Sequence, residues 1–168
     1  MENSTIEIVV KVCELLNKHG VEYLIVGGTA VALHGHHRGS LKPSGELAEK
    51  PDLDIWYNPS YQNYFRVLNV LNDLDVDVSN LKQEKTPNPK KSYFRKEFDG
   101  FTLDLLPELP GLSRFLTSYD KRVEPKIGEL KLPTLSYEDL MLNKKSLGRA
   151  KDIEDIKQLQ KKRRGLKK

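Results

Sequence analysis

The chain has 168 residues, of which 38% are hydrophobic and 31% are charged, a composition typical of one soluble domain with a modest core. Its single cysteine, Cys13, excludes an internal disulfide and a cysteine-based zinc site. No apolar run approaches membrane-spanning length and the N-terminus lacks the basic start of a signal peptide, so we expect a cytoplasmic protein with no membrane partner.

The net charge of +4 is distributed unevenly along the chain. Residues 144–168 contain 11 Lys/Arg against 3 Asp/Glu, so the C-terminal end is strongly basic. Such an end can contact phosphates, although a solvated tail is the more common meaning. We expect a single domain over residues 1–160, followed by a basic, disordered tail over residues 161–168.

The N-terminal part is predicted to form a helix, a strand and a second helix. Apolar residues recur at helical spacing over residues 4–18, and residues 23–26 have strand character. The chain then breaks at Gly27-Gly28 and resumes with the helical spacing of TAVALHGH. Because a helix start leaves N–H groups bare at the positive end of its dipole, this turn favours phosphate. A simple strand-to-helix turn is the alternative.

A second motif follows a predicted surface loop over residues 37–51, whose length is typical of functional or mobile loops. In the strand DLDIWY, alternation places Asp52 and Asp54 on one face. Two like charges on one face need a cation, a proton or a basic partner. A phosphate turn beside a carboxylate pair therefore predicts a site for a magnesium-bound nucleotide.

The middle of the chain supplies a third acid. Ser60 is predicted to cap a helix that ends near residue 74 and buries, on its inner side, Tyr61, Tyr64, Phe65, Leu68 and Leu71. Residues 75–91 are polar and irregular, and Asp99-Gly100 predicts a hairpin between strands over residues 92–98 and 101–106. Asp104 then lies within an apolar strand, where an acid is costly to bury alone. It is expected to face the Asp52/Asp54 pair, with a core Arg or Lys as the alternative partner.

The last third is predicted to be mostly helical. A short helix is expected within residues 112–119 and an extended segment over 127–135. Ser136 opens a helix with an acid three residues later, as in a capping box. The last helix begins near Ala150 and loses its apolar stripe after Leu159, beyond which we expect little order.

Five of these elements, taken in order, resemble a known family. They are GGTAVALHG, Arg38, DLDIW, TLDLL and KKSLGRAKDIEDIKQL. The chain resembles the small nucleotidyltransferases of the DNA polymerase β superfamily, in particular the AbiEii-type toxins and related minimal nucleotidyltransferases, over residues 21–159. The resemblance implies an α+β fold, with a small mixed sheet flanked by helices and a C-terminal helical part.

The resemblance also implies roles for the matched residues. It assigns catalysis and the binding of two Mg²⁺ ions to Asp52, Asp54 and Asp104, the last of which can take the proton of the attacking hydroxyl. It assigns nucleotide binding to Gly27, Gly28, Thr29, Arg38, Lys144 and Arg149. Two such ions, about 3.5–4 Å apart, would stabilise both the entering and the leaving oxygen of the transfer.

The chain departs from the family pattern in the first motif and in the loop. Gly28 stands where the family often has serine, Lys50 stands where it commonly has threonine, and the loop between Arg38 and Asp52 is longer than usual. The loop is either a tolerated insertion or a source of basic residues that reach the triphosphate or the acceptor.

Several charged and histidine residues also have a purely structural interpretation. His34, His36 and His37 have no carboxylate close in sequence to complete a zinc site, and the resemblance makes His34 structural. Without the resemblance, Lys144 and Arg149 would be interpreted as solvated charges on a helix. Asp152 and Asp155 are spaced to bridge basic neighbours on a helix.

Three function classes remain. We expect an enzyme that transfers a nucleoside monophosphate from a nucleoside triphosphate to a hydroxyl of RNA (transfer RNA included), a protein or a small molecule, as the toxin of a toxin–antitoxin pair with an antitoxin partner. The alternative is a catalytically weak nucleotide-binding or partner-binding protein. A glycosyltransferase with DLD as its metal motif is disfavoured, because 168 residues are few for such an enzyme and the glycine turn lies so close.

Overall fold

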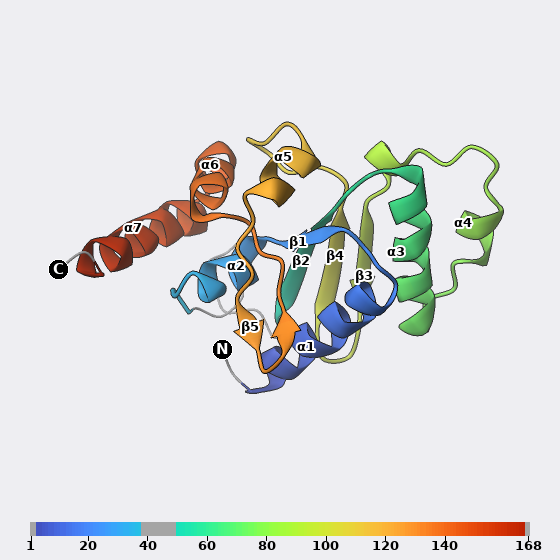
Figure 1. Cartoon of the computed structure of the whole chain (residues 1–168), viewed down its shortest axis with the longest axis horizontal. Helices are drawn as coiled ribbons and strands as arrows, with labels where there is room; N and C mark the ends of the chain where they lie inside the picture. The colour runs from blue at the N-terminus through green and yellow to red at the C-terminus, as the bar shows by residue number, and fades with distance from the viewer. Residues whose placement is uncertain (1–2, 38–49, 167–168) are drawn as a thin grey trace.

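A four-stranded mixed sheet forms the centre of the protein, in the order β1-β2-β4-β3 (Figure 1). The computed structural model describes residues 3–37 and 50–166. The strands are β1 (Tyr23–Ile25), β2 (Asp52–Tyr57), β3 (Phe94–Glu97) and β4 (Thr102–Leu106). The central pair, β2 and β4, is parallel, and each edge strand is antiparallel to its neighbour. This is the small mixed sheet expected from the sequence.

Helices flank the sheet in two groups (Figure 1). On the side of β3 lie α3 (Tyr61–Asp73), α4 (Ser79–Gln83) and the 3-10 turn η1 (Pro89–Lys91), and α3 contacts α1 (Asn3–Lys18). Toward the β1 end lie α2 (Gly27–Leu33), α6 (Tyr137–Leu147) and α7 (Ala150–Gly165). The remaining elements are α5 (Phe115–Asp120) and a small hairpin of β5 (Lys126–Ile127) and β6 (Leu130–Lys131).

Alternation along β2 separates a buried face from a polar one. Leu53 and Ile55 are at most 2% exposed and belong to the hydrophobic core. Asp52 and Asp54 point to the opposite face, because successive side chains of a strand alternate. The Asp99-Gly100 turn joins β3 to β4 as predicted, and the register places Asp104 beside Asp54.

Local capping explains where the longer helices begin and end. The hydroxyl of Ser60 accepts a hydrogen bond from the Asn63 N–H, and that of Ser136 accepts one from the Asp139 N–H. Both residues were predicted as caps. Helix α6 ends at Gly148, whose φ of +61° lies in the left-handed region that favours glycine.

Two expectations about helices differ from the structure. The buried stripe of α3 is centred on Tyr64, Val67 and Leu71, so Tyr61 and Phe65 lie at its edge and are 64% and 37% exposed. Helix α7 continues to Gly165, past the predicted end of order. There the Arg163 guanidinium bonds the Glu138 carboxylate at 3.0 Å, an anchor that a sequence pattern does not reveal.

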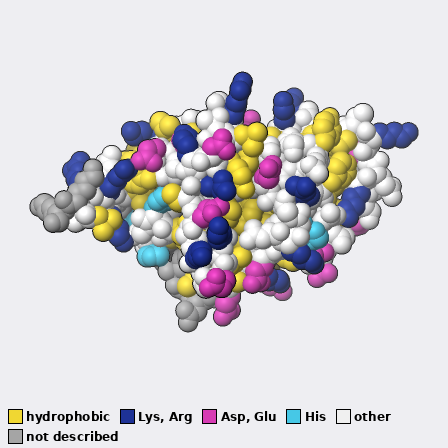
Figure 2. Space-filling view, viewed as in Figure 1, with side chains coloured by type: hydrophobic (Ala, Val, Ile, Leu, Met, Phe, Trp, Pro, Cys, Tyr) yellow, Lys and Arg dark blue, Asp and Glu magenta, His cyan; other side chains and the backbone are white. Residues whose placement is uncertain are grey.

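The surface in the orientation of Figure 1 carries charges of both signs. Figure 2 shows lysine and arginine side chains scattered over this face and interleaved with acidic ones, with hydrophobic side chains between them. Within the described part of the chain, no helix has both the length and the apolarity that crossing a membrane requires.

Candidate active site

Three carboxylates line one cavity of about 330 Å³. Asp52 and Asp54 come from β2, and Asp104 comes from the neighbouring strand β4. Because β2 and β4 are parallel with Asp54 opposite Asp104, the three acids share one face of the sheet. Sequence reasoning placed Asp104 near the pair, and the strand register is what brings it there.

The glycine turn between β1 and α2 lies in close contact with Asp54. Gly27 has a φ of +62°, and a Cβ at this position would lie 2.0 Å from Oδ2 of Asp54. The Val26 N–H also donates to the Asp54 carbonyl oxygen at 3.0 Å. Only glycine permits both this backbone conformation and this close approach. Gly27 and Gly28 line the cavity, whereas Thr29 is 7% exposed and lies outside its wall.

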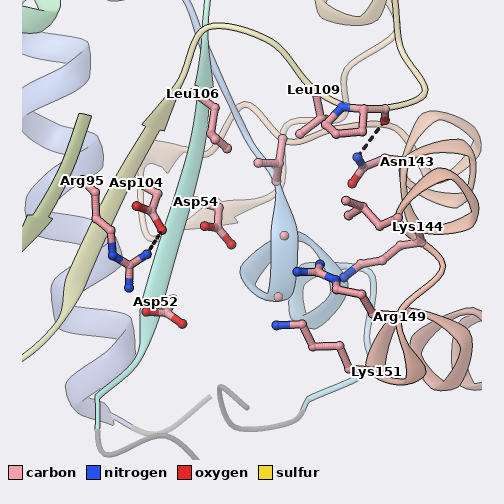
Figure 3. A pocket seen from close by; sticks show the side chains of 15 residues that line it. Asp52, Asp54, Arg95, Asp104, Leu106, Leu109, Asn143, Lys144, Arg149 and Lys151 are labelled. Atoms are coloured by element: carbon pink, nitrogen blue, oxygen red, sulfur yellow. Dashed lines mark hydrogen bonds and ion pairs between the residues drawn. The ribbon is translucent and has the colours of Figure 1, made fainter. Parts of the chain in front are cut away.

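The opposite wall of the cavity is basic. Lys144 reaches it from α6, and Arg149 and Lys151 reach it from the start of α7. In Figure 3 the nitrogen atoms of Arg149 and Lys151 point across the cavity toward the three aspartates. Sequence reasoning singled out Lys144 and Arg149 but assigned no role in the site to Lys151. The predicted Arg38 lies outside the described residues.

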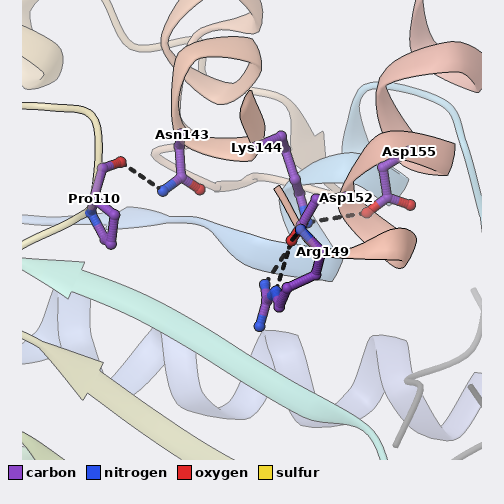
Figure 4. A network of polar contacts seen from close by, with 6 residues as sticks. All are labelled: Pro110, Asn143, Lys144, Arg149, Asp152 and Asp155. Carbon is purple, nitrogen blue, oxygen red and sulfur yellow. Dashed lines mark hydrogen bonds and ion pairs between the residues drawn. The ribbon is translucent and has the colours of Figure 1, made fainter. Parts of the chain in front are cut away.

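Lys144 also belongs to a buried ion network (Figure 4). Its ammonium lies 3.0 Å from Oδ1 of Asp152 and 3.0 Å from Oδ2 of Asp155, and all three side chains are at most 2% exposed. The Arg149 Nε donates to Oδ2 of Asp152 at 2.6 Å. Burial pushes the pKa of Asp152 up, but the hydrogen bonds from Arg149 and Lys144 outweigh it and hold the pKa below its usual value.

Two residues that sequence reasoning did not single out hold Asp104. The Tyr93 hydroxyl donates to Oδ1 of Asp104 at 2.6 Å, and the Arg95 Nη1 donates to Oδ2 at 2.7 Å. Arg95 lies directly opposite Asp104 in the pairing of β3 with β4. The signal was present in the sequence, since the predicted Asp99-Gly100 hairpin implies this register. Asp104 thus has both a basic partner and a place in the cavity.

The three histidines identified in the sequence do not gather around the carboxylates. The His34 Nε2 donates to the Leu135 carbonyl oxygen at 2.8 Å, and its ring packs edge-on against Tyr137. This contact ties α2 to the segment before α6. His34 therefore has the structural role that the sequence favoured over a zinc site.

Comparison with known proteins identifies the fold. No protein-family model matches the chain, and no curated protein matches it. Among solved structures, it is similar to a crystal structure from Thermotoga maritima of a protein provisionally named a nucleotidyltransferase, with a TM-score of 0.59 and 16% identity over 96% of each chain. The fold is nucleotidyltransferase-like. At this identity the similarity establishes the fold alone, and it confirms the predicted fold class.

Within this nucleotidyltransferase-like fold, Asp54 carries the clearest electrostatic signal. Burial and the nearby charges of Asp104 and Asp52 raise its pKa from 3.8 to about 6, against the lowering effect of Lys144 and Lys151. Each of the raising effects disfavours the ionised carboxylate. A cation that bound here would relieve the repulsion, so the site favours binding one.

The carboxylates of the cavity suit a Mg²⁺ ion that is also bound by substrate phosphates better than a metal ion held by protein side chains alone. In residues 3–37 and 50–166, no three His, Cys, Asp or Glu side chains are gathered closely enough to hold a metal by themselves. Asp104 is turned toward Tyr93 and Arg95. Mg²⁺, however, is commonly held by one or two carboxylates plus substrate phosphates rather than by an all-protein cage. Asp52 and Asp54 supply such a pair.

Proposed function

We propose that the protein is a magnesium-dependent nucleotidyltransferase, which moves a nucleoside monophosphate from a nucleoside triphosphate to an acceptor hydroxyl. The observation that carries the proposal is that one cavity has an acidic wall and, opposite it, a basic wall. Three carboxylates on adjacent strands lie across from Lys144, Arg149 and Lys151. One wall suits a divalent cation and the other suits a polyphosphate, which is the combination that a metal-bound nucleotide requires.

Each wall has a distinct task in this proposal. Asp52 and Asp54 would hold Mg²⁺, which when bound withdraws charge from the phosphate oxygens. Asp104 would accept the proton of the acceptor hydroxyl. At the same time the hydroxyl oxygen would form a bond to the α-phosphorus, and the bond between that phosphorus and the pyrophosphate oxygen would break. Arg149 and Lys151 would neutralise the departing pyrophosphate. Lys144 would act mainly by holding α6 and α7 in place.

Two further parts of the proposal have narrower support. The hydrogen bonds that Tyr93 and Arg95 make to Asp104 favour, as a second candidate, a nucleotide-binding protein with weak catalysis, because they engage the proposed base. The roles of AbiEii-type toxin, of an antitoxin partner and of a cytoplasmic location stay predictions from the sequence, since the contacts described above do not bear on them.

Label transfer tests the proposal. Full-length protein, Mg²⁺, each α-labelled nucleoside triphosphate in turn and a cell extract as acceptor pool should yield labelled RNA or protein. Asp54→Asn should abolish the label while the protein remains folded by circular dichroism. Glu154→Gln, the same change on an exposed residue of α7, should keep it.

The contrary result is also informative. Equal labelling by wild type and Asp54→Asn would show that this cavity does not carry the reaction. Magnesium-dependent nucleotide binding without any transfer, measured by calorimetry, would favour the second candidate.

A further inference from the structure

A second cavity, of about 690 Å³, lies beside the carboxylate cavity. The two cavities share Leu106 and Pro110 in their walls. Lys90, Lys91 and Tyr93 form the polar side of the second cavity. We call it the Tyr93 cavity. Its position matters because the basic wall of Lys144, Arg149 and Lys151 occupies the other side of the carboxylates.

Tyr93 connects the two cavities. Tyr93 is 50% exposed and lines the Tyr93 cavity, while its hydroxyl donates to Oδ1 of Asp104 at 2.6 Å. A ligand group that lies on the ring is therefore next to the carboxylate to which we assign proton removal. Exposed rings of this kind stack well on nucleic-acid bases.

The segment that forms this cavity is basic. Residues 82–97 contain six Lys/Arg against two Asp/Glu. Lys90 and Lys91 are exposed at the 3-10 turn η1, and the acid that lines the cavity with them is Glu108. Leu106, Pro107 and Pro110 supply an apolar surface between the charges. Lysines around an aromatic and apolar surface suit a ligand that alternates phosphates with flat bases.

The basic C-terminal end, by contrast, makes contacts within the protein. Arg163 pairs with Glu138 and stacks over the Tyr137 ring at 4.2 Å, and the Lys162 ammonium donates to the Gly35 carbonyl oxygen. These contacts engage two of the basic side chains near the end of α7. Residues 82–97, by contrast, place Lys90 and Lys91 in the same cavity wall as Tyr93, whose hydroxyl bonds Asp104.

We infer that the Tyr93 cavity is the acceptor site and that the acceptor is the end of a single-stranded nucleic acid. Lys90 and Lys91 bind its phosphates, Tyr93 stacks on its last base, and its terminal sugar hydroxyl reaches Asp104. This inference rests on the proposed function, because an acceptor site has meaning only beside a nucleotide donor. An acidic peptide, which would need no aromatic platform, is the alternative that the experiment must separate.

The first measurement is binding of a fluorescent 12-nucleotide single-stranded RNA with a free 3′ hydroxyl, without nucleoside triphosphate, as a function of salt. Lys90→Ala/Lys91→Ala should weaken binding at least tenfold at low salt. Loss of two phosphate contacts should also reduce the slope of log affinity against log salt by about 1.4. The matched control, Lys82→Ala/Lys85→Ala, removes the same charge from exposed residues of the same segment that lie outside the cavity wall. It should change affinity less than threefold.

Tyr93 variants test the stacking. Tyr93→Ala should weaken RNA binding by about tenfold, the loss typical of one stacked base. Tyr93→Phe keeps the ring and loses only the hydroxyl, so it should bind RNA like the wild type while its transfer rate falls. Circular dichroism melts establish that each variant is folded.

The outcomes separate the inference from the proposed function. Equal weakening by the two double-lysine variants overturns the site, and label transfer to protein but not to RNA overturns the acceptor class. Either result leaves the nucleotidyltransferase proposal standing if Asp54→Asn still abolishes transfer. Absence of magnesium-dependent nucleotide binding by the wild type overturns the proposed function, and the acceptor role with it, whatever the RNA binding.

Discussion

Two clusters of buried or half-buried acids lie on opposite sides of one cavity, and they differ in how their charge is balanced. In the α6–α7 network, Lys144 lies 3.0 Å from both Asp152 and Asp155. On the sheet, the mutual repulsion of three aspartates adds to burial and raises the pKa of Asp54 to about 6. In the first arrangement the buried charges are paired, so the loss of one partner would be costly. The second is held at a cost in stability that a bound cation would reduce.

The largest expected effect comes from breaking the balanced cluster. Lys144→Met keeps the length of the side chain but leaves two buried carboxylates without their shared cation. We expect a loss of about 3–5 kcal/mol in the free energy of unfolding, the usual cost of removing one partner from a buried ion pair. Urea denaturation at pH 7.5 measures it.

The neighbouring lysine provides the control for that change. Lys145 is exposed on the same helix, so Lys145→Met should alter the free energy of unfolding by at most about 0.5 kcal/mol. Equal destabilisation by the two variants would mean that the network contributes no more than a surface charge does.

A second, intermediate effect distinguishes the clusters by their pH dependence. The pKa of Asp54 is raised from 3.8 to about 6, so the folded protein favours the protonated carboxyl. The contribution of Asp54 to the free energy of unfolding is therefore fully present below pH 4 and is lost as pH rises through 6. In EDTA this loss should reach about 3 kcal/mol, since one pKa unit corresponds to about 1.4 kcal/mol. Asp152, whose pKa is lowered, acts with the opposite sign, so its contribution is present above pH 4 and lost below.

Urea denaturation in EDTA between pH 4.5 and 7.5 checks this sign. Asp54→Asn should flatten the profile and should be more stable than the wild type at pH 7.5, although it is expected to be inactive. A variant that is less stable than the wild type at pH 7.5 would contradict the assignment of an unfavourable charge to Asp54.

The smallest expected effect concerns Arg95, the cation paired with Asp104. Its side chain is 48% exposed, so Arg95→Ala should cost at most about 1 kcal/mol of stability. Removal of this positive charge from the aspartate cluster should instead raise the affinity for Mn²⁺ about fivefold, measured by electron paramagnetic resonance. Lys96→Ala, the next residue on β3, should leave the metal affinity unchanged. Weaker metal binding by Arg95→Ala would show that Arg95 supports the cation site instead of competing with it.

The sheet and its acids were predictable because their signals are local. Alternation in DLDIWY and the Asp99-Gly100 hairpin are read from a few neighbouring residues, and together they place Asp104 with Asp54. Arg95 was within reach of the same reasoning, because the hairpin register pairs it with Asp104. What the sequence pattern did not supply is the direction in which each long side chain turns.

The ion network and the helix faces depended on tertiary packing. Lys144 and Asp155 meet only because α6 and α7 pack against each other around Gly148. On α3 it is Tyr64 that packs against Phe94 of β3, whereas Phe65 is 37% exposed. Near the end of α7, Arg163 pairs with Glu138, 25 residues away in the sequence. The periodic spacing of apolar residues in the sequence predicts none of these contacts.

The parallel pairing of β2 with β4 has a consequence for biosynthesis. β2 ends at Tyr57 and β4 begins at Thr102, so the aspartate face forms only after a long intervening segment has left the ribosome. The basic wall, which ends at Lys151, is translated later still. A nascent chain therefore exposes its acids before it has the cations that face them, and any chemistry in this cavity begins only after Lys151 has been translated.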